Sequence, residues 1–360
     1  MADAIAEQIA ALKDEDWAIR EEAATMLGTF RDPRAVVPLV SMLRDRDRAV
    51  RDAAIGALLA IGEPAVLPLG ACLSDPVLTV QELASSVLAT IADARVLTQL
   101  MVALTSPDWI VRMHAAKALG RIRDPEAVGV LVPRLQDSVK AVREEASSAL
   151  AAIGEAALSS LLSALTHAEW LVRLHAVEAL GKTGSPEAVA PLLSVLFNDQ
   201  DRAVREDAIR ALGQIGDARA VEFLITVTKE PGLRPLAVEA LGRIGDRRAV
   251  PVLINVLEGV DRAGLSRPID SWDDHWNEEI ITLGVAAKGL GVIRDETAIP
   301  ALIRALRHTM TRTDAADALA RFGDQAIAPL LALLAQESDD NIRYHVKETL
   351  AKVGWRAGRI

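Results

Sequence analysis

The chain has 360 residues, of which 51% are hydrophobic and only 3% aromatic, and its formal net charge is −10 at pH 7. This charge gives no general attraction to a phosphate backbone, so we expect no nucleic-acid partner, and a partner with a basic surface is easier to accommodate. Cys72 is the single cysteine, which excludes an internal disulfide, and because the chain has neither a signal-peptide pattern nor an apolar run long enough to cross a bilayer, we expect a cytoplasmic protein without a membrane span.

One short pattern recurs along the chain about every thirty residues. A branched residue is followed by Arg, then by small apolar residues, and then by Ala-Leu-Gly or a similar run. The arginines in this position are Arg20, Arg51, Arg112, Arg143, Arg173, Arg205, Arg234 and Arg343, and Gln81 fills the gap after Arg51. A fixed period of this length predicts stacked repeats, each burying its apolar stripe against its neighbours. We expect the arginines to form a ladder between repeats by pairing with turn acids such as Asp124 or Asp217.

Each repeat is predicted to contain two helices. The first helix begins at a pair such as Asp32-Pro33, where Asp can cap the helix and the missing N–H of Pro costs nothing. The second helix is expected to run from about Trp17 to Leu27 and to end at Gly28. Glycines in the same position should end the other second helices, namely Gly120, Gly181, Gly213, Gly242 and Gly291. The chain is therefore predicted to be an all-α solenoid of about eleven helix pairs between Ala4 and Val353, with no β-strand.

The regular repeats occupy residues 1–257, and degenerate repeats occupy residues 279–354, followed by a short tail over residues 355–360. Between the two groups of repeats, an insertion over residues 258–278 carries Trp272, His275 and Trp276 among acidic residues. Disordered linkers are poor in Trp, so we expect this segment to dock on the repeats or on a partner. The alternative is a metal site made by Asp273, Asp274 and His275.

The repeat pattern is complete in VREDAIRALGQIGDARAVEFLITV, which covers residues 204–227. This pattern resembles the HEAT-like repeats of the phycobilisome-lyase type, and the resemblance covers almost the entire chain. It implies a right-handed superhelix of helix pairs, in which one face of each second helix lines a concave groove. The family includes chromophore lyases, metal-dependent hydroxylases and plain binding scaffolds, so the resemblance leaves these functions open.

The second residue after each Arg lies on that face of the second helix. Along the chain this position holds Glu22, Ala53, Leu83, His114, Glu145, His175 and Asp207, so four consecutive repeats present His, Glu, His and Asp. Neighbouring helices pack about 10 Å apart, which would let a His and a Glu meet at a metal ion or hydrogen-bond each other. Three roles are therefore open: a polar or ion-paired groove lining, ligand capture through hydrogen bonds, and weak metal ligation by His114, Glu145, His175 and Asp207.

The hydroxylases of this family carry His-Glu in the two positions directly after Arg. This chain instead has Met113-His114 and Leu174-His175, and the intervening repeat has Glu144-Glu145. The motif is not met, which disfavours a di-iron centre.

Trp109 and Trp170 begin their second helices, as Trp17 does. A Trp in this position either covers the end of the repeat stack or acts as an aromatic clamp. An apolar centre flanked by acids is typical of an interface hot spot or a planar-ligand pocket. The predicted groove site comprises Trp109, Met113, His114, Glu144, Glu145, Trp170, Leu174, His175, Glu206 and Asp207.

The sequence contains no nucleophile elbow, phosphate loop, paired cysteines or nucleotide fingerprint, and we assign no catalytic residue. The primary hypothesis is a non-enzymatic scaffold that binds a protein or peptide in the groove. The first alternative is a lyase or chromophore-handling protein for a bilin or another tetrapyrrole, held by His114, Glu145 and His175. The second alternative is a metal-dependent enzyme of the hydroxylase type, with a divalent metal as its cofactor. The net charge disfavours a HEAT-like DNA repair glycosylase.

Overall fold

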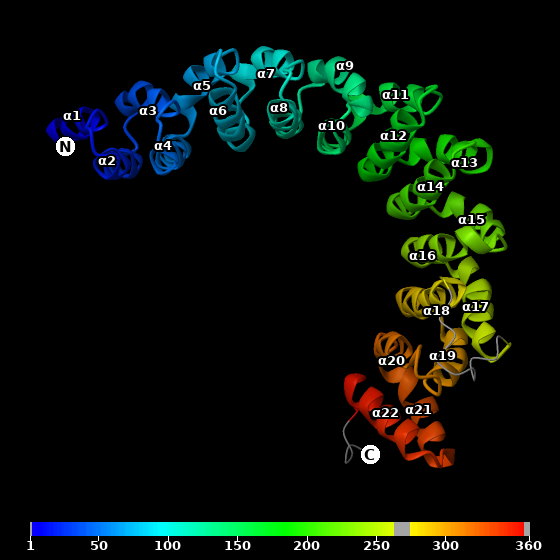
Figure 1. The fold of residues 1–360 in the computed structure, drawn as a ribbon. Helices are drawn as coiled ribbons and strands as arrows, with labels where there is room; N and C mark the ends of the chain where they lie inside the picture. Colours follow the sequence, from blue (N-terminus) through cyan, green and yellow to red (C-terminus); the bar gives the residue numbers. More distant parts are fainter. Residues whose placement is uncertain (1, 263–273, 356–360) are drawn as a thin grey trace. The chain divides into compact units, whose positions relative to one another are not determined.

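The computed structural model describes residues 2–262 and 274–355, and these residues contain helices, turns and loops but no β-strand. They form the helices α1 to α22 (Figure 1), which pair into eleven repeats as predicted. The first helices of the pairs are α1 Ala2–Ala11, α3 Val36–Met42, α5 Val66–Cys72, α7 Leu97–Ala103, α9 Val128–Leu131, α11 Glu155–Ala164, α13 Val189–Asn198, α15 Val221–Val227, α17 Val250–Arg262, α19 Ile299–Ala305 and α21 Asp324–Gln336.

The second helices of the pairs are α2 Trp17–Phe30, α4 Arg48–Ile61, α6 Leu78–Ile91, α8 Trp109–Ile122, α10 Lys140–Ile153, α12 Trp170–Thr183, α14 Arg202–Ile215, α16 Arg234–Ile244, α18 Asp274–Ile293, α20 Arg312–Ala320 and α22 Asp340–Lys352. Many first helices follow a short 3₁₀ turn. At Pro33–Ala35, for example, the Asp32 side chain accepts a hydrogen bond from the backbone N–H of Arg34 at 2.9 Å. This is the capping arrangement that the Asp-Pro pairs predicted.

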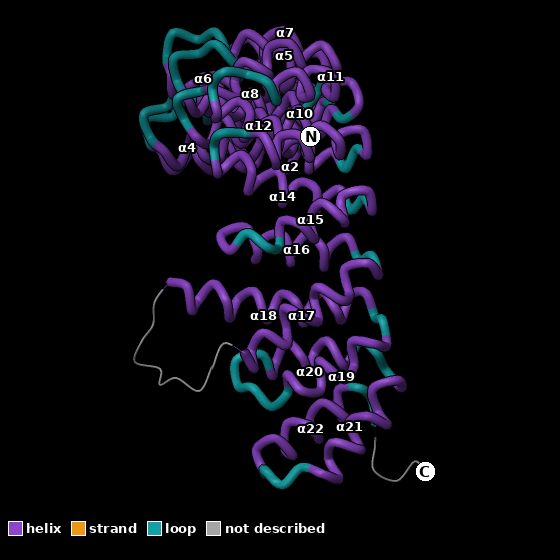
Figure 2. Tube along the Cα trace, turned by 90° about the vertical axis from the view of Figure 1, so that its right-hand side faces the viewer, coloured by secondary structure: helices purple, strands orange, loops and turns teal. Residues whose placement is uncertain are grey.

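The helices form two compact units, unit 1 over Met1–Thr183 and unit 2 over Gly184–Ile360. Within unit 1, the odd-numbered helices from α3 to α11 lie in one layer and the even-numbered helices lie in a second layer (Figure 1). Within unit 2, the pairs from α15–α16 to α21–α22 stack one after another (Figure 2). No single helix of residues 2–262 and 274–355 is long and apolar enough to cross a membrane. Taken together, Arg48–Ile61 and Glu63–Cys72 have the length and composition of a membrane span, but the pair is bent by 118°.

Small apolar residues form the core between neighbouring second helices. In α8, the buried side chains are Val111, Ala115, Ala116, Ala118 and Leu119, at the spacing expected for the packed side of a helix. The same positions are buried in α6, α10 and α12, whereas in α2 the corresponding Ile19 and Met26 are exposed. Alanines at these positions let the helices of neighbouring repeats approach closely.

The glycine of the repeated Ala-Leu-Gly run has a different role from the one predicted. Gly28 and Gly120 do not end their helices, because α2 continues to Phe30 and α8 continues to Ile122. A Cβ atom added to Gly120 would lie only 2.7 Å from the Cα of Ala149 in the next repeat, and Gly28 has the same relation to Ala57 at 2.8 Å. The prediction that these glycines act as helix ends is therefore wrong.

The same error applies to the other second helices, which run on past Gly181, Gly213, Gly242 and Gly291. Their ends lie a few residues later, at left-handed residues that include Gly216 with φ 74° and Gly245 with φ 75°. The glycine within the helix is a packing residue that allows close contact between repeats.

Most of the repeated arginines bind carbonyl groups of the turn that precedes their own helix, with Arg205 as an exception. Arg112 donates to the carbonyls of Ser106 at 2.9 Å and Pro107 at 3.0 Å, and its Nε donates to Asp137 of the next repeat at 2.8 Å. Arg20 makes the same contacts and reaches Asp45 at 2.8 Å, which holds the pKa of Asp45 below its usual value through the hydrogen bond. A ladder between repeats is confirmed for these two arginines.

The prediction that Asp124 and Asp217 pair with the arginines of the ladder is wrong. Asp124 caps the 3₁₀ turn at Pro125–Ala127, and Asp217 caps the 3₁₀ turn at Ala218–Ala220 and binds Arg219. The acids in the ladder lie in the turn between the two helices of a repeat, because that turn faces the guanidinium group of the preceding repeat.

Candidate functional site

The predicted site residues of unit 1 lie on three neighbouring second helices, α8, α10 and α12. The side chain of Asp108 caps α8 by accepting hydrogen bonds from the backbone N–H groups of Ile110 at 2.6 Å and Val111 at 3.3 Å. The cap fixes Trp109 as the first residue of the helix, where 42% of its surface is exposed. Trp170 occupies the same position in α12 and is 41% exposed. Each Trp is therefore partly buried and partly open to a partner.

Each exposed Trp is followed, one helical turn later, by an apolar residue. Met113 follows Trp109 and Leu174 follows Trp170, and both are partly exposed. Side chains four residues apart on a helix lie side by side, so each helix presents an aromatic–aliphatic pair. These two pairs are separate apolar patches on α8 and α12, whereas the sequence predicted one apolar centre flanked by acids.

The helix between them, α10, presents charge in the same positions. Lys140 begins α10 and lies 3.3 Å from Glu144, its neighbour one turn later. Glu145 is partly exposed and takes part in no ion pair or side-chain hydrogen bond within the described part of the chain. We call the surface formed by Trp109, Met113, Glu144, Glu145, Trp170 and Leu174 the α8–α12 face.

His114 binds the preceding repeat through one ring nitrogen. Its Nδ1 lies 3.1 Å from the Ser85 hydroxyl, and that hydroxyl donates its own hydrogen to the Glu82 carbonyl at 2.8 Å. The Ser85 oxygen must then accept a hydrogen from Nδ1, which places the lone pair of the neutral ring on Nε2. Burial, with a smaller contribution from the charge of Lys117, lowers the pKa of His114 below its usual value, so the ring is neutral near pH 7.

His175 has a different environment although it occupies the same repeat position. Only 5% of its surface is exposed. Arg143 donates from Nε to its Nε2 at 3.2 Å, and its Nδ1 lies 3.0 Å from Glu178. Both ring nitrogens are thus engaged by protein groups, and His175 connects α10 to α12 instead of lining an open surface.

Glu178 connects the buried His175 to a partly exposed lysine. Its other oxygen accepts a hydrogen bond from Lys182 at 2.7 Å, and Lys182 also donates to Ser148 at 3.0 Å. Burial alone would raise the pKa of Glu178, but the hydrogen bonds from His175 and Lys182 outweigh it and lower the pKa to about 2. The prediction that His175 lines the groove is therefore not supported by its burial, and its role in the structure is to hold two repeats together.

The histidines and acids of this region do not fit a metal centre. No group of three or more His, Cys, Asp and Glu side chains among the described residues is arranged to hold a metal ion. His175 has no free nitrogen, and Ser85 occupies one nitrogen of His114. A shared metal site of His114, Glu145 and His175 would require the network around His175 to break.

The remaining predicted residues lie in other parts of the chain. Glu206 and Asp207 belong to α14 of unit 2, where Arg202 binds Glu206 at 2.8 Å and Arg210 binds Asp207. These acids form ion pairs within their own helix.

The predicted insertion falls largely outside the described residues. Trp272 lies outside the described residues, as does Asp273. His275 and Trp276 fall in α18, but their side chains are also outside the described part. Helix α17 extends to Arg262 and helix α18 begins at Asp274, so both ends of the predicted insertion are helical.

Sequence reasoning missed the residues that distinguish the two histidines. Ser85 and Ser147 each lie on the helix preceding a histidine, four positions after Gln81 and Arg143. Ser147 donates to the backbone carbonyl of His175 at 3.2 Å, whereas Ser85 contacts the ring of His114. The sequence contains a signal for both serines, because an Ala-Ser-Ser run occurs in each helix one repeat before the histidine.

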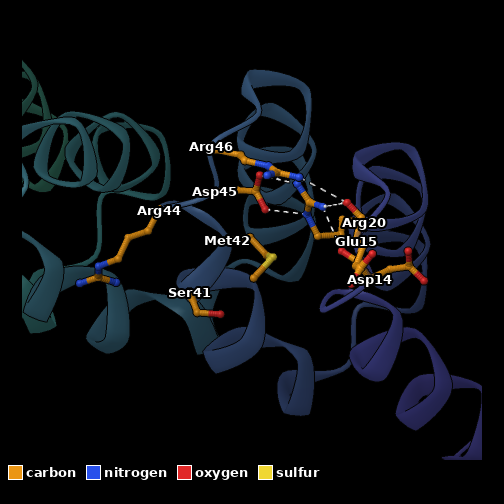
Figure 3. A pocket seen from close by; sticks show the side chains of 8 residues that line it. All are labelled: Asp14, Glu15, Arg20, Ser41, Met42, Arg44, Asp45 and Arg46. Atoms are coloured by element: carbon orange, nitrogen blue, oxygen red, sulfur yellow. Dashed lines mark hydrogen bonds and ion pairs between the residues drawn. The ribbon is translucent and has the colours of Figure 1, made fainter.

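A pocket of about 670 Å³ also lies between the turns before α2 and α4 (Figure 3). Its lining includes three arginines, but each already has an acidic partner. Arg20 binds Asp45, Arg46 lies 3.5 Å from Asp47, and Arg44 points away from Arg20 and pairs with Asp75. The pocket is part of the arginine ladder, and it offers no free cation to a ligand.

Comparison with known proteins supports the repeat assignment. HEAT repeats match at residues 5–69, 68–151, 130–196, 158–232, 189–263 and 277–351. The chain belongs to the HEAT repeat family. It is similar to deoxyhypusine hydroxylase of Rattus norvegicus, with 32% identity over 227 residues that cover 54% of this chain and 74% of that protein.

Solved HEAT-repeat structures show the same fold at low sequence identity. A structure of Kap95p with RanGDP matches 97% of this chain and 57% of that chain, with 13% identity and a TM-score of 0.66. Kap121p bound to the extreme C-terminus of the phosphatase Cdc14p matches 98% of this chain and 46% of that chain, with 14% identity and a TM-score of 0.64. The chain thus spans about half the length of these two karyopherins.

Proposed function

We propose that this HEAT-repeat chain is a non-enzymatic scaffold that binds a protein or peptide partner on the α8–α12 face. The observation that carries the proposal is the pair of half-exposed tryptophans, Trp109 and Trp170, which begin second helices two repeats apart. Trp is enriched among the residues that dominate binding energy at protein interfaces, where it sits in a well-packed centre surrounded by polar groups. Met113 and Leu174 extend the apolar area, and Glu144 and Glu145 supply the polar surroundings.

The alternative role for these tryptophans is to cover the end of their own repeat. That role accounts for the part of each ring that is buried but leaves the exposed part without a function. Trp17 provides the comparison within the chain, since it begins α2 in the same way and is 48% exposed. The residue one turn after Trp17 is Glu21, so α2 lacks the aromatic–aliphatic pair.

The charge of the chain favours a partner with a basic surface. The net charge is −10, and Glu145 has no cationic partner within the described residues. A basic partner would associate faster and would meet uncompensated carboxylates. Two of the similar solved structures hold karyopherins bound to segments or proteins, namely the extreme C-terminus of Cdc14p and the SUMO protease Ulp1p, which supports protein binding by solenoids of this fold.

The test begins with a partner that co-purifies with the native protein and is then prepared separately. Binding of the purified partner is measured by calorimetry to the wild-type chain and to the Trp109→Ala, Trp170→Ala and Trp17→Ala variants. Loss of a tryptophan from an interface centre weakens binding by about 2 kcal/mol or more, whereas Trp17→Ala should have little effect. Equal binding by all four proteins would show that the partner does not use the α8–α12 face.

Similarity to deoxyhypusine hydroxylase favours a metal-dependent enzyme as a second candidate. The residues on the α8–α12 face do not fit its centre, because the positions after Arg112 and Arg173 hold Met113-His114 and Leu174-His175 instead of His-Glu. The test is elemental analysis of protein purified without an affinity tag. Stoichiometric iron, zinc or manganese that is lost in a His114→Ala variant would support the enzyme and would contradict the scaffold.

Chromophore handling rests on the resemblance to lyase-type repeats and on the apolar residues beside His114. In this proposal His114 would contact a tetrapyrrole through Nε2, since Nδ1 is bound to Ser85. Absorbance titration with bilins and haem tests it directly. An unchanged spectrum at micromolar ligand would remove this alternative.

A further inference from the structure

The α8–α12 face has an internal order that specifies the chemistry of its partner. Apolar pairs on α8 and α12 flank a charged helix, α10, and the three helices are consecutive in the same layer of unit 1 (Figure 1). The sequence of surfaces along the face is therefore apolar, charged, apolar. A partner that covers it must present two apolar groups separated by a group that matches the charge of α10.

The start of α10 carries two cations and two anions, and one of the cations, Arg143, binds His175 and the carbonyls of Asp137 and Ser138. Lys140 and Glu144 neutralise each other at 3.3 Å, which leaves Glu145 without an ion-pair partner among the described residues. On the two flanking helices, the corresponding positions hold Met113-His114 and Leu174-His175, and neither histidine offers positive charge to Glu145, because His114 is neutral and His175 is buried. The carboxylate of Glu145 therefore calls for a cation from the partner.

The spacing of the helices sets the length of the partner segment. Packed helices lie about 8–10 Å apart, so the two apolar pairs, which are two repeats apart, are separated by about 16–20 Å. An extended chain advances about 3.3 Å per residue, and the span corresponds to about six residues. Side chains of an extended chain alternate in direction, so only residues an even number apart face the same surface.

We propose that the α8–α12 face binds an extended peptide segment with two large apolar side chains six residues apart and an Arg or Lys between them on the same side. The apolar side chains pack on the Trp109–Met113 and Trp170–Leu174 pairs. The cation lies over α10 and pairs with Glu145, where the neighbouring Trp rings can also contact it. This inference rests on the proposed function and specifies the class of partner.

The test uses synthetic nine-residue peptides labelled with a fluorophore. The designed peptide has leucine at its second and eighth positions, arginine at its fourth and sixth positions, and serine or threonine elsewhere. One control moves the second leucine to the fifth position, and another replaces both arginines with glutamates. Affinities for the full chain are measured by fluorescence anisotropy.

The designed peptide should bind at least tenfold more tightly than either control. Trp109→Ala and Trp170→Ala should each weaken it at least tenfold, while Trp17→Ala should change it by less than twofold. Glu145→Lys should reverse the preference and favour the glutamate peptide. Glu22→Lys is the matched control, since Glu22 holds the same repeat position on α2 and has no ion pair with the residues that the structure describes, and it should keep the preference for arginine.

Equal affinity for the three peptides, no binding at millimolar concentration, or an equal loss in the Trp17→Ala variant would overturn the inference. So would concentration-dependent self-association in sedimentation that requires Trp109, because a second copy of the chain would then occupy the face. Circular dichroism checks that each variant is folded. If a natural partner still depends on Trp109 and Trp170 while the peptides fail, the peptide inference falls and the scaffold function stands.

Discussion

The helices α8 and α12 share one sequence pattern, WIVRMHAAKALG in the first and WLVRLHAVEALG in the second, yet their histidines lie in different environments. His114 is half-buried, neutral and bound through one nitrogen, whereas His175 is buried and bound through both. The residue three positions later accounts for much of this difference. It is Lys117 in α8 and Glu178 in α12, and only the glutamate can accept a hydrogen from the ring. Equivalent positions in a repeat can therefore carry different roles.

The tryptophans of the same two helices behave in the opposite way. Trp109 and Trp170 have almost equal exposure, and each has an apolar neighbour one turn later. The two helices are thus alike in their exposed residues and differ in how their histidines contact the preceding repeat. We infer that partner binding depends on both helices, whereas stability and pH response distinguish them.

The largest expected effect is the loss of His175. His175→Ala removes two hydrogen bonds of a buried ring and leaves a cavity between α10 and α12, so the free energy of unfolding should fall by about 2–4 kcal/mol. His114→Ala loses one partly exposed contact and should cost about 1 kcal/mol. Urea unfolding followed by circular dichroism compares the two variants. Equal losses would mean that the two environments are energetically the same.

The next effect is the response of α12 to acid. The pKa of Glu178 is about 2 in the folded chain, below the usual value of 4.5, so its stabilising effect is complete above about pH 4.5 and is lost as the pH falls toward 2. The contribution is on the order of 2–3 kcal/mol. Wild type and Glu178→Gln should therefore differ in free energy of unfolding at pH 6 and converge toward pH 2. A difference that stays constant over this range would contradict the assigned network.

A smaller effect should appear at His114. Burial and Lys117 lower its pKa, so the folded chain favours the neutral ring and its stability decreases as the pH falls below the usual value of 6.5. Lys117→Glu should raise the pKa of His114, as measured by NMR titration of the ring protons. Lys140→Gln, which changes a cation on the next helix, serves as the control for net charge. An unchanged pKa in the Lys117→Glu variant would show that the charge does not act on the ring.

The repeat period allowed the fold to be predicted from the sequence, because each repeat carries its own caps and apolar stripe. Gly120 shows where that reasoning failed, since an Ala-Leu-Gly run is compatible both with a helix end and with close packing against Ala149. The environment of His175 could not be predicted from the sequence either, because it depends on Arg143, thirty-two residues away in the chain. Trp109 and Trp170 could be recognised because they depart from the polar residues, such as Lys140, found at the same repeat position.

The most direct test of the central claim is hydrogen exchange of the full chain with and without its purified partner. A partner on the α8–α12 face should slow the exchange of backbone amides in α8, α10 and α12. Exchange in α2 should not change, because the residue one turn after Trp17 is Glu21. Protection confined to the odd-numbered helices of unit 1, or equal protection of α2, would contradict the claim.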